Sequence, residues 1–237
     1  MHIQGNFAII GSSHIASQSV EEVKRAFDTF QPDIVALELD QKRFTGLLNK
    51  EKNEKKPSAK YMIKRIGLTG FLFAKIGEFA QKKLGEIVNM DPGSEMITAI
   101  KVAGERKIQI ALIDQDIEIT LKRLSKKFTF KEKMRLIGDV LSGLFGKKEV
   151  MEFDLSKVPP DELIKKMVLE LKTRYPSLYN VLVMERNIVM ERNLKSILTK
   201  ENDKKVLVIV GAGHFDYICK HISNFIVDKN STIGNVS

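Results

Sequence analysis

Short apolar runs alternate along this chain with longer segments in which apolar residues recur every three or four positions. A short, continuous apolar run is typical of a buried strand, and the longer period is typical of an amphipathic helix. Strands that alternate with helices favour an α/β fold built on a largely parallel sheet. The predicted strands are about 6–10, 34–38, 108–113 and 206–210.

Helices are predicted where this period is bounded by capping residues or by proline. The sequence Gln31-Pro32-Asp33 ends the first helix, and Tyr175-Pro176-Ser177 separates two long ones. Asp116 is expected to cap the helix that follows it. The predicted helices are about 17–30, 60–89, 94–106, 116–125, 130–145, 160–174, 178–199 and 215–227.

The segment between the second and third strands has two parts of different character. Residues 49–59 are highly charged and poor in apolar residues, which predicts an exposed loop. Residues 60–89 form a basic amphipathic segment. Three interpretations fit it: a helix pair in the core or in a dimer interface, a lid over the site, or a helix that lies on a membrane surface.

Composition and charge indicate which partners and which cellular compartment are favoured. The net charge is +9, which permits an anionic partner, but the lysines are spread along helices and linkers, so a solvated surface is favoured over a nucleic-acid site. Cys219 is the only cysteine, so no intrachain disulfide forms and a reducing, cytoplasmic compartment is favoured. There is no signal peptide pattern and no apolar run long enough to span a bilayer.

Two Gly-x-x-His motifs, at residues 11–14 and 211–214, carry most of the chemical information. Each follows a predicted strand, and in an open α/β sheet the loops after the strands converge at the edge where ligands bind. Glycine at a strand exit allows a sharp turn and the close approach of a ligand. We therefore expect His14 and His214 to form two halves of one site, as metal ligands or proton carriers.

Glu38 and Asp40 end the second predicted strand and point to the same edge. A carboxylate that closes an apolar strand is costly to bury without a cation. The set His14, Glu38 and His214 would make a two-histidine, one-carboxylate metal site with positions left open for water and substrate. The plainer alternative for Glu38 is a helix cap or an ion-pair partner.

Further polar residues are candidates with simpler structural explanations. Asp114 and Asp116 follow the third strand and could extend the site or cap the next helix. Glu95 stands in the first turn of its helix, where the helix dipole alone would explain it. Arg186 and Asn187 lie on a long helix and are either surface residues or donors to a carbonyl or anionic oxygen.

The ordered set of these motifs resembles the TraB/PrgY family, which is related to the Tiki proteins. The resemblance covers nearly the whole chain and depends on several short motifs together. It departs from the family at Gln115, where arginine is expected between the two aspartates. The matching motifs are Gly11–His14, Glu38–Arg43, Pro92–Met96, Leu112–Ile117 with Thr120 and Arg123, Glu185–Asn187 with Met190, and Gly211–His214.

The resemblance implies a mixed β-sheet flanked by helices, like that of erythromycin-esterase and ChaN-type proteins. It implies one domain over residues 1–237, with a helical insertion at about 49–92 and a mainly helical segment at about 116–200. The C-terminal membrane region of many prokaryotic members is absent from this chain, so tethering to a membrane on its cytoplasmic side is a further expectation.

The resemblance also implies an active site at the paired Gly-x-x-His motifs and dependence on a divalent metal, manganese or cobalt, with zinc as a further candidate. The metal ligands would be His14, Glu38 and His214, with Arg186 and Asn187 as further catalytic residues. Four motif residues are expected to bind substrate: Arg43, Glu95, Asp114 and Arg123.

Two functions follow as hypotheses. The first is a metal-dependent hydrolase of the peptidase type that acts on a peptide or signalling polypeptide. The second is a non-catalytic module that binds a peptide or pheromone in the same pocket. Expected partners beyond the peptide are a second copy of the chain and a membrane, reached through missing C-terminal spans or through the basic segment 60–89.

Overall fold

The computed structural model of the chain describes residues 1–12, 17–48, 58–88, 93–145 and 161–234. The described residues form a five-stranded sheet in the order β1-β2-β5-β3-β4. β1 runs antiparallel to β2, and the other neighbours are parallel. The strands are β1 (His2–Gln4), β2 (Phe7–Ser12), β3 (Ile34–Leu37), β4 (Gln109–Leu112) and β5 (Val206–Gly211).

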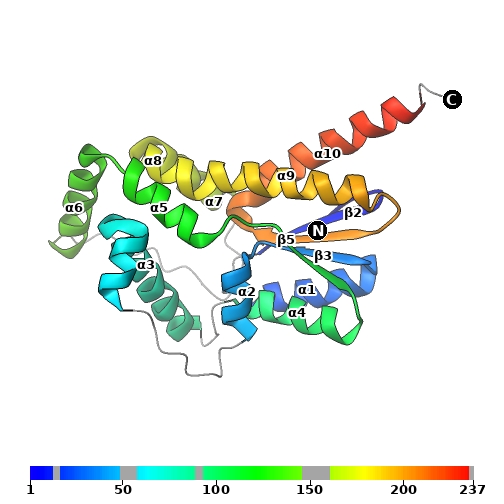
Figure 1. Cartoon of the computed structure of the whole chain (residues 1–237), viewed down its shortest axis with the longest axis horizontal. Helices are drawn as coiled ribbons and strands as arrows, with labels where there is room; N and C mark the ends of the chain where they lie inside the picture. The colour runs from blue at the N-terminus through cyan, green and yellow to red at the C-terminus, as the bar shows by residue number, and fades with distance from the viewer. Residues whose placement is uncertain (13–16, 49–57, 89–92, 146–160, 235–237) are drawn as a thin grey trace.

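Helices cover both faces of this sheet, which confirms the predicted mixed α/β class (Figure 1). One face is covered by α1 (Ser17–Phe30) and α4 (Ser94–Glu105), and the other by α9 (Glu185–Lys200) and α10 (Ala212–Gly234). The remaining elements are α2 (Gln41–Leu48), α3 (Ala59–Val88), α5 (Ile117–Lys127), α6 (Phe130–Phe145), α7 (Asp161–Arg174), α8 (Pro176–Tyr179) and the π-helix η1 (Asn180–Met184).

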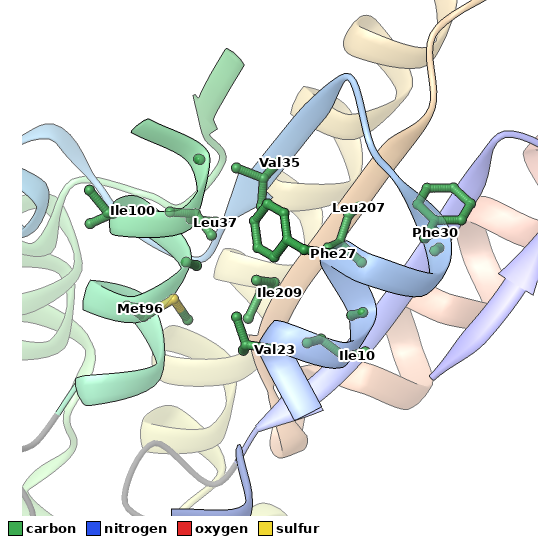
Figure 2. Close-up of a cluster of buried hydrophobic side chains, with 14 of the residues drawn as sticks. Ile10, Val23, Phe27, Phe30, Val35, Leu37, Met96, Ile100, Leu207 and Ile209 are labelled. Carbon is green, nitrogen blue, oxygen red and sulfur yellow. The ribbon is translucent and has the colours of Figure 1, made fainter. Parts of the chain in front are cut away.

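The two-residue period of the strands sends successive side chains to opposite faces. Figure 2 shows one of the two resulting cores, in which Phe27 of α1 and Met96 of α4 pack against Leu37, Leu207 and Ile209 of the sheet. Alternate strand residues build the other core against α9 and α10. Because the strands are buried on both faces, they read as continuous apolar runs in the sequence.

Several predicted boundaries differ from the observed ones. The expected helix over 178–199 is divided into α8, η1 and α9, and the expected helix over 215–227 begins at Ala212. β1 and α2 were not predicted. The charged segment 49–59 lies mainly outside the described residues. Among the described helices, none combines the length and apolar character needed to cross a membrane.

The helix α3 lies beyond the end of the sheet (Figure 1) and belongs to a third, smaller core. It is interrupted at Gly67, whose positive φ of 79° an L-residue with a side chain rarely adopts. Phe73 packs edge-on against Phe128, with ring centroids 5.2 Å apart. The inward face of α3 is therefore a core face, as one of the three sequence interpretations proposed.

Gly70 sets the distance between α3 and α5. A Cβ atom added there would lie 2.6 Å from the backbone oxygen of Leu121. We expect Gly70→Ala to lower the free energy of unfolding by about 1–3 kcal/mol, because the backbones must separate. The matched change Gly138→Ala, where no atom lies within 4 Å, should raise it by about 0.5–1 kcal/mol through helix propensity. Urea unfolding measures the free energy of unfolding of both variants, which should fall in Gly70→Ala and rise in Gly138→Ala.

Glu132 joins the start of α6 to α8. Its Oε2 accepts hydrogen bonds from the backbone N–H (3.1 Å) and the hydroxyl (2.7 Å) of Thr129, and its Oε1 accepts one from the N–H of Ser177 at 2.8 Å. Burial alone would raise the pKa of this carboxyl, but the hydrogen bonds from Thr129 and Ser177 outweigh it and lower the pKa below 4.5.

Glu132→Gln should lower the free energy of unfolding by about 1.5–3 kcal/mol at neutral pH, because hydrogen bonds to a charged acceptor are lost. Because the pKa of Glu132 is lower in the folded state, its charged carboxyl stabilises the protein above pH 4.5. This contribution to stability is lost as the pH falls through the lowered pKa. The difference between wild type and variant, measured by urea unfolding, should therefore shrink in acid. A difference that stays constant with pH would contradict this.

Candidate functional site

The strand order brings the second Gly-x-x-His motif between the first motif and Glu38. β5 lies between β2 and β3, and Ser12 stands beside Gly211 in the register of the parallel pair. On the other side, the N–H of Glu38 donates to the carbonyl of Ile209 at 3.1 Å. His14 lies outside the described residues. The predicted convergence at one sheet edge thus holds for the strand ends that carry both motifs.

Glu38 is the buried centre of this edge, with 3% of its surface exposed. The N–H of Gly211 donates to its Oε2 at 2.6 Å. Its Oε1 contacts the Nη2 of Arg186 and lies 3.4 Å from the Nε2 of His214. A carboxylate this deeply buried needs such partners to offset its desolvation, so Glu38 is held in one fixed position.

The imidazole of His214 is oriented by Asn187. Its Nδ1 lies 2.6 Å from the Oδ1 of Asn187, and both residues are buried. An amide oxygen only accepts hydrogen bonds, so this contact places a proton on Nδ1. In the neutral ring, Nε2 then carries a lone pair, and it faces the Oε1 of Glu38.

Arg186 ties Glu38 to Asp114, whose side chain is 2% exposed. Its Nε and Nη2 donate to the two oxygens of Asp114 at 2.9 and 2.7 Å, a bidentate pair, while Nη2 also contacts Glu38. Burial alone would lower the pKa of Arg186, but Glu38 and Asp114 outweigh it and raise the pKa above its ordinary value. The guanidinium is a permanent positive charge of the site.

Arg43 completes the charged cluster from α2. Its Nη1 donates to the Oδ2 of Asp114 at 3.1 Å and to the carbonyl of Glu38 at 3.2 Å. The side chain of Arg43 is 34% exposed, so it is the most accessible group of this cluster. The cluster of Glu38, Asp114, Arg43 and Arg186 balances two carboxylates against two guanidinium groups.

A π-helical turn precedes the residues that α9 contributes. η1 ends at Met184, and α9 then presents Arg186 to β3 and the loop after β4, and Asn187 to α10. Successive residues of a helix point about 100° apart, so the register of α9 decides which side chain meets which partner. π-helical turns occur often at functional sites. The sequence period did not signal this one.

The other predicted polar residues lie elsewhere or cap helices. Asp40 accepts from the N–H groups of Lys42 and Arg43 at 2.7 and 3.0 Å and thereby caps α2. Asp116 caps α5, as expected. Arg123 pairs with Glu185 at 2.8 Å. Glu95 is buried in the first turn of α4.

One contact of the site had no side-chain signal in the sequence. The backbone N–H of Gly211 donates a hydrogen bond to Glu38, although glycine was interpreted only as a residue that permits a turn and the close approach of a ligand. Backbone donors are present at nearly every residue, so only the fold shows which of them is used. The glycine of the second motif thus has a role in fixing the carboxylate.

Two of the three predicted metal ligands have a separation that one ion could bridge, although the described residues contain no cluster of three ligands. Among them, no group of three or more His, Cys, Asp and Glu side chains is placed around one point. Two ligands of one tetrahedral ion lie about 3.4 Å apart when each bond is about 2.1 Å, and the Nε2 of His214 and the Oε1 of Glu38 are 3.4 Å apart. Nitrogen and carboxylate donors fit manganese, cobalt or zinc.

Comparison with known proteins gives a consistent set of relatives. The model of the TraB/PrgY/gumN family matches residues 3–223. An uncharacterised protein of Methanocaldococcus jannaschii is 36% identical over 221 residues, which cover 90% of this chain and 52% of the relative. A TraB domain-containing protein of Homo sapiens is 24% identical over 240 residues, which cover 91% of this chain and 62% of the relative. The chain therefore spans about half to three fifths of the length of these relatives.

Proposed function

We propose a function for this chain, which belongs to the TraB/PrgY/gumN family. It would be a divalent-metal-dependent hydrolase of the peptidase type. Its substrate would be a peptide or a signalling polypeptide. The site at the carboxyl ends of β2, β5 and β3 would carry the reaction, since this is where open α/β sheets bind ligands.

The observation that carries the proposal is the contact between His214 and Glu38. Asn187 holds a proton on Nδ1, so in the neutral form of His214 the Nε2 lone pair would face a carboxylate oxygen at 3.4 Å. Two acceptors in this arrangement repel each other unless a proton or a cation lies between them. A divalent cation would relieve this repulsion and bind both groups.

The metal would be held by His214 and Glu38, with His14 of the first motif as the third ligand, and manganese, cobalt and zinc are the candidates. When bound, it would lower the pKa of a water molecule and polarise a substrate carbonyl. The role of His14 is inferred from the resemblance of the motifs. The geometry of His214 and Glu38 supports their role as the other two ligands.

The remaining residues of the site would orient the metal ligands and stabilise the charge that develops on the substrate. Asn187 keeps the proton of His214 on Nδ1 and fixes the plane of the ring, as the outer partners of metal-bound histidines do. Arg186 orients Glu38 and Asp114 and supplies a fixed positive charge that stabilises negative charge developing on a carbonyl oxygen. Arg43, which is partly exposed, would bind a polar group of the substrate.

Metal content is the decisive measurement. Purified wild type and the double variant His14→Ala/His214→Ala would be loaded with manganese, cobalt or zinc, desalted and analysed by mass spectrometry. We expect one equivalent in the wild type and none in the variant, followed by cleavage of a peptide library by the loaded wild type. Absence of metal from the wild type would overturn the proposal.

A second candidate function is a non-catalytic peptide-binding module. It is favoured by Arg186, which already neutralises Glu38 without any metal. In this case a proton would lie between His214 and Glu38. The protein would bind members of the peptide library without cleaving them and without bound metal, so the same two measurements distinguish the two functions.

A further inference from the structure

The outward faces of α3 and α6 expose large apolar side chains to solvent. On α3, three of them follow at intervals of four residues, and on α6 three follow at intervals of four and three, so each row occupies one face of its helix. Their exposures run from 51% to 77%, with Phe130 the highest. The residues are Leu68, Leu72 and Ile76 on α3, and Phe130, Met134 and Ile137 on α6.

Both helices pack against the same small core, so the inward face of each helix already has packing partners within the protein. Phe73 of α3 and Leu136 of α6 pack against the cluster around Leu124 and Phe128. On ideal helices, these inward residues point about 100° or more away from the exposed rows. The exposed rows are therefore not required for the internal packing of the protein.

α3 is strongly basic, and α6 carries a small excess of basic residues. α3 contains six Lys or Arg residues and two Asp or Glu residues, and the whole chain has a net charge of +9. Exposed lysines stand on the same helices, at Lys60 and Lys64 before the break at Gly67 and at Lys131 next to Phe130. Exposed apolar side chains beside lysines are the pattern of helices that lie in the interface of an acidic bilayer.

We propose that the outward faces of α3 and α6 form a surface that docks onto an acidic lipid bilayer. A second copy of the chain would present the same positive charge to this surface, and juxtaposed like charges oppose association. A bilayer with anionic headgroups satisfies both features, because it accepts the apolar side chains and attracts the lysines. The surface would place the protein on the membrane without a spanning segment.

The test is sedimentation of the full chain with vesicles of pure phosphatidylcholine and of equimolar phosphatidylcholine and phosphatidylglycerol. We expect binding to the acidic vesicles only, and release at high salt because the attraction is screened. Leu72→Ser/Phe130→Ser should weaken binding about tenfold or more, because the burial of two apolar side chains is lost. Lys60→Gln/Lys64→Gln/Lys131→Gln should weaken it as well.

Matched controls separate this surface from general charge and hydrophobicity. Val227→Ser removes a side chain that is 55% exposed on α10, and Lys101→Gln/Lys200→Gln removes two exposed lysines elsewhere. Both should bind like wild type, and circular dichroism would verify that every variant is folded. The proposal is overturned by no binding, by equal binding to neutral vesicles, by controls as weak as the surface variants, or by a dimer that Leu72→Ser/Phe130→Ser disrupts.

Discussion

Arg186→Met is expected to lower the free energy of unfolding by about 3–5 kcal/mol, because removal of one partner leaves buried carboxylates without their counter-ion. The side chains of Glu38 and Asp114 are 4% and 2% exposed, and both depend on this guanidinium. Arg43 keeps a contact of 3.1 Å with Asp114, so the loss falls most heavily on Glu38. Equilibrium unfolding in urea measures the effect.

The control for this result is Arg106→Met. Arg106 also forms an ion pair, with Asp28 at 2.6 Å, but both side chains are largely exposed at 44% and 64%. Surface pairs contribute about 0–1 kcal/mol, so this variant should unfold almost like wild type. Similar losses of stability in the two variants would show that Arg186 is not a buried counter-ion.

Glu38→Gln is expected to reduce kcat/KM of the proposed hydrolase by about a factor of 10² to 10⁴, the range lost when a positioned catalytic group is removed. Glutamine keeps the size of the side chain but loses the charge that would face the metal and His214. The rate of peptide cleavage by metal-loaded protein measures the effect, and metal content measured in parallel shows whether the ion is still bound.

Glu185→Gln is the matched control, because Glu185 lies on the same helix as Arg186. It pairs with Arg123 and Lys127 at 2.8 and 2.6 Å. These partners outweigh burial, which alone would raise its pKa, and lower the pKa below the ordinary value. Removal of its charge should leave cleavage close to wild type. An equal loss of activity in both variants would mean that the charge of Glu38 has no special role.

Much of the architecture could be predicted from local patterns. The parallel strands were found because strands buried on both faces are continuous apolar runs, and α6 was found at its observed bounds. β1 was missed because its pattern is short and largely exposed. The helix over 178–199 was expected to be regular, because a π-helical turn leaves the apolar composition of a helix unchanged.

Part of the site could also be predicted from local patterns in the sequence. Glu38 was singled out because it directly follows a buried strand, and His214 because it ends a Gly-x-x-His motif after another strand. The structure brings these two side chains together. The roles of Asn187 and Gly211 toward them could not be predicted. A hydrogen bond between α9 and α10 depends on the register of two packed helices, and no periodicity in either one specifies the other.

The sequence by itself determined the class of fold, the strands and the residue types available at their ends, because apolar periodicity and strand-exit glycines are local properties of the chain. Only the tertiary structure decided that β5 lies between β2 and β3 and that Arg186 joins Glu38 to Asp114. The physical reason is that strand order and the pairing of buried charges depend on contacts between residues far apart in the chain, whose free energy is gained only when the whole sheet and its helices have assembled.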